Sequence, residues 1–153
     1  MKYYRITLAL AGLISIPCYS QQAANSPSRI SGKEHPELID DATAYWHLFR
    51  VLGRSQGEPD DMFQRRRLAF AKKTGLAAGQ IPMLLAAADT FALQMTGFDG
   101  QPVTAALRET RTAAVLRIFE ALHGALGPPD AAVLNDYVNN KVKRSIVLLV
   151  PAA

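Results

Sequence analysis

The sequence predicts an all-α protein, folded as a single-domain up-and-down bundle of about five helices. In five stretches after residue 36, apolar residues recur every three or four positions, which is the period of one helix face. No stretch alternates apolar and polar residues between two turn signals, so a sheet has no evident source. The connections between successive stretches are short, which favours antiparallel neighbours around one apolar core.

The first two helices have recognisable starts and stops. The first should begin at Asp40 or Asp41, because a carboxylate there accepts hydrogen bonds from the free amides of the opening turn, and it should end at Gly53. The second should begin after Pro59, where two aspartates suit the positive end of the helix dipole. It should end before Gly75.

The next two helices are also bounded by glycines. The third follows Leu76, tolerates Pro82 in its opening turn and ends at Gly97. The fourth is the longest, opening near Thr104 and ending at Gly127, after which two prolines prevent continuation.

The fifth helix, introduced by Asp130, leads into the apolar run Val147–Val150. The β-branched residues of this run favour an extended segment, whereas continuity with the helix favours further helix. We expect helix. An exposed apolar strip over Ile146–Val150 would indicate contact with a partner or a membrane.

Residues 1–20 have the layout of a secretory signal peptide. Lys2 and Arg5 precede the apolar run Ile6–Ile16, and the small residue Ser20 closes the segment. The run is too short to cross a bilayer, which takes about twenty apolar residues. We therefore expect export to the periplasm or the exterior, with cleavage near Ser20 and no transmembrane span in the mature chain.

A lipid anchor at Cys18 is the alternative, but Pro17 stands where bacterial lipoprotein signals have Gly, Ala or Ser. Cleavage near Ser20 removes the only cysteine, which excludes disulfides and thiolate metal sites. It also reduces 17 basic residues to 15 against 13 acidic ones, a net charge of +2. Nucleic-acid binding is therefore not expected. Residues 21–36, polar and poor in apolar side chains, should form a flexible leader before a bundle domain over 37–153.

Chemistry-bearing motifs are absent from the sequence. No histidine has a His, Cys, Asp or Glu four positions away, and no phosphate-binding loop or nucleophile elbow is present. We therefore predict no catalytic residue, metal or cofactor. An enzyme whose site is assembled from scattered residues is kept as an alternative, with His47, Asp89, Glu120 and His123 as candidates.

Two groups of residues are candidates for binding. Arg65 and Arg66 lie seven positions before Lys72 and Lys73, so one side of the second helix should be basic and suit an anionic partner. A second group is aromatic and apolar and would line an interhelical cavity for a small ligand or lipid: Trp46, Phe49, Phe91 and Met95.

Two helix openings, Leu76–Gln80 and Leu126–Asp130, resemble the Leu-Thr-x-x-Gln signature of small helical periplasmic proteins linked to envelope stress and chaperoning. Ala77 and Gly127 replace the threonine, and Asp130 replaces the glutamine. The resemblance implies a helical envelope protein. We therefore expect a non-enzymatic exported protein that associates with another envelope or secreted protein; the alternatives are the small-ligand carrier and the scattered-residue enzyme.

Overall fold

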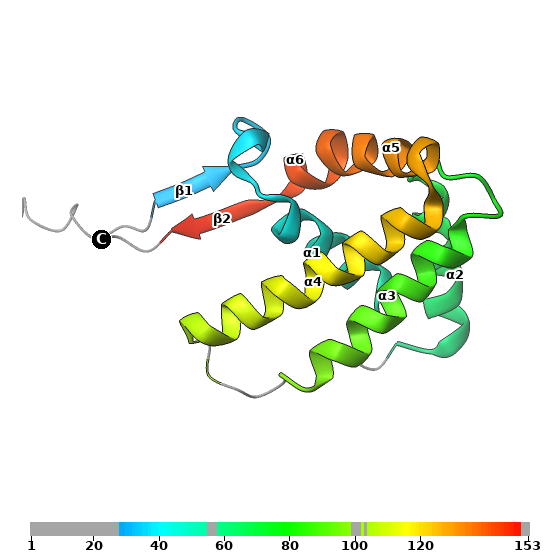
Figure 1. The fold of residues 1–153 in the computed structure, drawn as a ribbon, viewed down its shortest axis with the longest axis horizontal. Coiled ribbons are helices and arrows are strands. Elements are labelled where there is room, and N and C mark those ends of the chain that lie inside the picture. Colours follow the sequence, from blue (N-terminus) through cyan, green and yellow to red (C-terminus); the bar gives the residue numbers. More distant parts are fainter. Residues whose placement is uncertain (1–27, 55–57, 99–101, 103, 151–153) are drawn as a thin grey trace, which may run out of the picture.

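The computed structural model describes residues 28–54, 58–98, 102 and 104–150 (Figure 1). The expected signal peptide and the first part of the expected leader lie outside these residues. The described chain is an all-α bundle, as predicted. Its five main helices are α1 (Asp41–Leu52), α2 (Asp60–Lys72), α3 (Ile81–Thr96), α4 (Ala105–Leu126) and α5 (Pro128–Tyr137). None of the described helices is long and apolar enough to cross a membrane.

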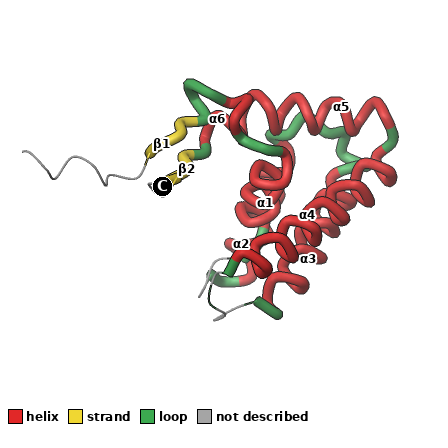
Figure 2. The backbone as a smooth tube through the Cα atoms, turned by 60° about the vertical axis from the view of Figure 1, so that its left-hand side comes forward, coloured by secondary structure: helices red, strands yellow, loops and turns green. Residues whose placement is uncertain are grey.

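Helix α1 occupies the centre of the fold. It packs against α2, α3 and α4, while α3 and α4 form the most extensive helix pair and run side by side (Figures 1 and 2). The inward face of α1 is almost fully buried and consists of Ala44, Tyr45, Leu48, Phe49 and Leu52. The spacing of these residues is that of one helix face, so the local pattern accounts for the burial.

The helix ends follow local rules. Asp40 caps α1, with its Oδ1 accepting from the amide of Thr43 at 2.7 Å, and Thr104 caps α4 by accepting from the amide of Leu107 at 3.1 Å. Gly127 has φ of +76°, which lets the chain turn sharply between α4 and α5. Helix α5 then begins at Pro128, two residues before the expected start, because proline is tolerated in a first turn.

The prediction of helix for Val147–Val150 is wrong. Helix α5 continues through a π-helical segment, η2 (Val138–Val142), and one short turn, α6 (Lys143–Ser145), and the chain then becomes extended at Ile146. Val147–Val150 is strand β2, paired antiparallel with strand β1 (Ser28–Ser31). Residues 28–31 of the expected leader are therefore an ordered part of the fold, and the boundary at residue 37 is corrected to include them.

Gly32 permits this arrangement. Its amide donates to the carbonyl of Ile146 at 2.9 Å, and a Cβ at this position would lie only 1.9 Å from the carbonyl oxygen of Lys143. Only glycine therefore fits where the N-terminal strand crosses the end of α6. Ile30 and Leu148 pack against the core, and the ribbon extends beyond the helices (Figure 1).

Candidate functional site

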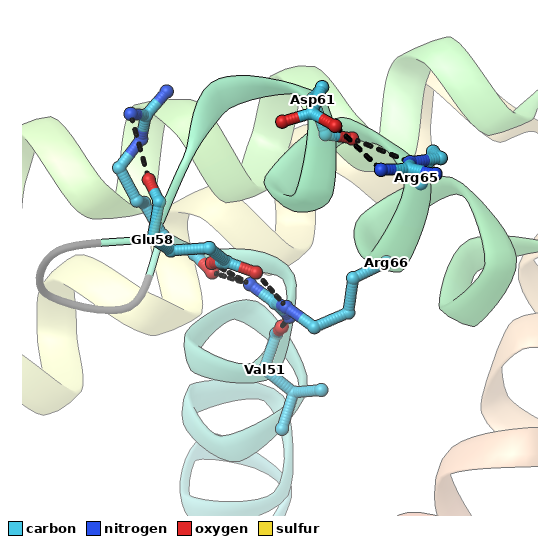
Figure 3. A network of polar contacts seen from close by, with 7 residues as sticks. Val51, Glu58, Asp61, Arg65 and Arg66 are labelled. Carbon is cyan, nitrogen blue, oxygen red and sulfur yellow. Dashed lines mark hydrogen bonds and ion pairs between the residues drawn. The ribbon is translucent and has the colours of Figure 1, made fainter.

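The structure gives the four cations expected on one side of α2 different surroundings, and Figure 3 shows two of them, Arg65 and Arg66. Arg65 forms an ion pair with Asp61 one turn earlier, with Nη2 and Oδ2 2.6 Å apart, and both side chains are exposed. Such an i,i+4 pair at the surface contributes little to stability. Its positive charge is nevertheless balanced by a neighbour.

Arg66 points toward the end of α1 (Figure 3). Its Nε and Nη2 donate to the two carboxylate oxygens of Glu58 at 2.8 and 2.9 Å. Its Nη1 and Nη2 also donate to the carbonyls of Val51 and Gly53, which are free acceptors at the C-terminal end of a helix. Arg66 therefore joins α2 to α1, and four of its five guanidinium N–H donors are used within the fold.

The sequence interpretation missed the adjacent Arg67. This side chain is buried, donates to the carbonyl of Leu85 at 2.8 Å and pairs with Asp89 at 2.9 Å. Its guanidinium also lies 5.0 Å from the ring centre of Phe63. The burial of Arg67 could have been predicted from the sequence, because positions 63, 67 and 71 share one helix face and Phe63 and Ala71 are apolar.

Lys72 and Lys73 are exposed and form no ion pair within the described residues. They do not border the same hollow: Lys72 lies beside the α2–α3 contact, and Lys73 faces α5. The expected basic surface is thus reduced to two separated lysines and the neutralised Arg65.

The structure brings the four aromatic and apolar candidates together in one pocket. Trp46 and Phe49 from α1, with Phe91 and Met95 from α3, line one pocket of about 420 Å³. Phe91 joins the aromatic side chains, since its ring centre lies 6.3 Å from that of Trp46 and 5.7 Å from that of Phe49. The pocket volume is within the range of small-molecule sites.

The apolar floor of the pocket consists of the side chains of Trp46, Phe49, Phe91 and Met95. Three arginines surround this floor, and the sequence interpretation did not include them. Arg50 comes from the last turn of α1, Arg54 from the segment that follows this helix, and Arg111 from α4. Arg54 pairs with Asp60, whereas Arg50 lies over the ring of Trp46 at 5.0 Å. No acidic side chain lines the described part of this pocket. The site therefore combines an apolar surface with a positive rim.

Arg111 has an incomplete set of partners. Its Nη2 donates to the carbonyl of Phe98 at 3.1 Å, and its guanidinium lies 5.6 Å from the Phe98 ring. Its Nε is buried and has no acceptor among the described residues. Because a buried N–H donor without an acceptor is unfavourable, this half-buried side chain favours a hydrogen-bond acceptor nearby.

A network of hydrogen bonds joins α1 to α4 and α5. The Tyr45 hydroxyl donates to Asn135 Oδ1 at 2.8 Å and lies 2.9 Å from His123 Nε2. Because the hydroxyl proton is donated to Asn135, the hydroxyl oxygen accepts a hydrogen bond from His123, which places a proton on Nε2 of the imidazole. Burial, and secondarily Asp41, raises the pKa of Tyr45. Burial lowers the pKa of His123, and Asp41 opposes that change. The group therefore links α1, α4 and α5 in its neutral form.

The residues of the enzyme alternative are not gathered into one site. His123 bonds to Tyr45, Asp89 pairs with Arg67, and Glu120 is exposed on α4. His47 stacks edge-on against Trp46, and burial followed by the charge of Arg50 lowers its pKa. No three His, Cys, Asp or Glu side chains in the described chain are close enough to hold a metal ion.

Another hollow, of about 450 Å³, lies between α3 and α4. It is lined mainly by small side chains such as Ala86 and Ala121, with Arg117 at its border and no aromatic residue. It lacks both the aromatic floor and the clustered cations of the α1–α3–α4 pocket.

Comparison with models of protein families, with curated proteins and with solved structures gave no match. The resemblance to envelope proteins with the Leu-Thr-x-x-Gln signature stays a prediction. In the structure, Leu76–Gln80 immediately precedes α3, and Leu126–Asp130 comprises the last residue of α4, Gly127 and the first residues of α5.

Proposed function

We propose that this protein binds a small, largely apolar molecule in the pocket between α1, α3 and α4. One observation carries the proposal: four apolar side chains from two helices, three of them aromatic, meet in a single open cavity. A core of this kind is normally filled by its own side chains. The proposal fits an exported carrier, and it requires no catalytic group.

The basic side of α2 is less favourable as a binding site than this pocket. This side was expected to contact an anionic protein, but Arg66 is bonded to Glu58, Arg67 is buried against Asp89, and Arg65 is paired with Asp61. The aromatic pocket, in contrast, presents apolar side chains whose mutual contacts leave a cavity of about 420 Å³.

The test is titration with the neutral dye N-phenyl-1-naphthylamine. Trp46 is the only tryptophan of the chain and borders the pocket, so quenching of its emission reports binding at this place. Ala92 is an exposed residue that lines the pocket. Ala92→Phe should fill the pocket and weaken dye binding at least about tenfold, equivalent to about 1.4 kcal/mol.

The matched control is Ala121→Phe, which places the same side chain in the hollow between α3 and α4. This variant should bind the dye as the parent protein does. Loss of binding in Ala121→Phe but not in Ala92→Phe would place the ligand in the other hollow, and absence of dye binding in the parent would contradict the proposal.

Protein association is a second candidate function, favoured by the β1–β2 ribbon. The ribbon contains only two strands among the described residues, so each strand has one edge without a partner strand there. Leu149 is 69% exposed and Val147 is 45% exposed on one face of it. An extended segment of another protein could add to such an edge and cover these side chains.

This candidate is tested by crosslinking the protein in its own exported fraction and identifying the captured partner. Leu149→Lys should abolish capture, whereas Leu93→Lys should not, because Leu93 is similarly exposed, at 75%, but lies on α3. Equal capture by both variants would contradict a role of the ribbon.

A further inference from the structure

We propose that the molecule bound in the α1–α3–α4 pocket is an amphiphilic carboxylate, whose headgroup is received by Arg50 and Arg111. This inference rests on the proposed function and specifies its ligand class. An apolar tail would lie on the aromatic floor, and a single negative group would lie at the positive rim.

The charge balance of the pocket supports an anion. Of the three arginines, only Arg54 has an acidic partner in the described chain, which is Asp60. Arg50 and Arg111 come from different helices, and neither forms an ion pair with an acidic side chain among the residues that the structure describes. Two cations without an ion pair in the described part of the chain border the same apolar surface, so the pocket attracts a ligand that carries negative charge as well as apolar groups.

The chemistry of these cations favours a carboxylate. A guanidinium presents planar N–H donors whose geometry matches the two oxygens of a carboxylate. Arg111 donates one of them to the carbonyl of Phe98, so it is positioned by the protein and keeps further donors. Arg50 is held over Trp46, which places its charge beside the apolar floor.

The size of the pocket limits the ligand. A cavity of about 420 Å³ is at the small end of ligand sites, so it suits one short or medium apolar chain or one fused ring system. A double-chain lipid would need more apolar surface than the four floor residues provide. The structure therefore points to a compact monocarboxylate.

The experiment compares decanoate with decanamide, which have nearly the same shape and differ in charge. Each is titrated as a competitor of N-phenyl-1-naphthylamine, with Trp46 emission as a second readout. Decanoate should displace the dye at a concentration at least about tenfold lower than decanamide. This preference should shrink as salt is added, because exposed charges are screened.

Three arginine variants locate the headgroup. Arg50→Gln and Arg111→Gln should each reduce the preference for decanoate at least threefold while leaving decanamide affinity unchanged. Arg117→Gln is the control, because this arginine lies on α4 but borders the other hollow. The readout is a ratio of affinities, and Arg50 is exposed, so the conclusion does not depend on how well Arg111→Gln folds.

The outcomes separate the two proposals. Equal displacement by decanoate and decanamide, or a preference that survives both substitutions, would overturn the assignment of a carboxylate while leaving the apolar pocket in place. Failure of the neutral dye to bind would overturn the proposed function itself, and this inference with it.

Discussion

Removal of the Tyr45 hydroxyl should destabilise the protein without changing its packing. The side chain is 1% exposed, and its ring packs edge-on against Phe119 at 4.5 Å, so phenylalanine fills the same space. The hydroxyl joins three helices through His123 and Asn135. Tyr45→Phe therefore deletes both hydrogen bonds and leaves two half-buried groups without this partner.

The magnitude follows from the two bonds. Each contributes roughly 0.5–1.5 kcal/mol net, so the free energy of unfolding should fall by about 2 kcal/mol. For a urea dependence of about 2 kcal/mol per molar, the unfolding midpoint should move down by about 1 M. Urea titration followed by far-ultraviolet circular dichroism and by Trp46 emission measures this shift.

Tyr137→Phe is the matched control. Tyr137 is half-buried, its ring contacts Phe70 at 6.2 Å, and its hydroxyl has no hydrogen-bond partner among the described residues. Its loss should change the free energy of unfolding by less than about 0.5 kcal/mol. If Tyr45→Phe shifted the midpoint no more than Tyr137→Phe, the reasoning about the three-helix network would be refuted.

Three further predictions concern stability. Arg66→Gln should lower the free energy of unfolding by about 2 kcal/mol, because it removes the bonds to the Glu58 carboxylate and to the carbonyls at the end of α1. Arg65→Gln should change it by less than about 0.5 kcal/mol, because its ion pair is exposed. Equal urea midpoints for the two variants would contradict this prediction. Gly32→Ala should lower the thermal midpoint strongly, since its Cβ meets a backbone oxygen at 1.9 Å, while Gly124→Ala, on an open helix surface, should raise it slightly. Burial lowers the pKa of His123 in the folded protein below its ordinary 6.5, so the unfolded chain takes up the proton first as the pH falls. The free energy of unfolding should therefore be highest above about pH 6.5 and decrease below it. In urea titrations between pH 7 and 5, His123→Gln should reduce this decrease.

The helices could be predicted because their determinants are local. Asp40 and Thr104 cap helices by bonding to amides three residues later, and the buried face of α1 repeats with the helix period. Each of these relations spans at most a few residues and is readable from the sequence. The five main helices therefore appear close to their expected positions.

The candidate site could be predicted only in part. Trp46 and Phe49 share a helix, and the inward placement of Phe91 and Met95 follows from the same periodicity, so their meeting in one cavity needs only the packing of α1 on α3. The positive rim could not be foreseen, because Arg50 and Arg111 are 61 positions apart and meet only through the tertiary arrangement. Likewise, the run Arg65–Arg67 is uniform in sequence, yet three neighbouring guanidiniums have three different surroundings.

The sequence by itself determined the helices, their caps and the apolar faces that form the core, because backbone hydrogen bonds within a helix are made between near neighbours. The tertiary structure alone decided that Val147–Val150 is a strand. That segment has no helical requirement of its own, and its extended form is stabilised by hydrogen bonds to Ser28–Ser31, at the opposite end of the described chain. Pairing over such a distance depends on how the helices bring the two segments together, and no local pattern encodes it.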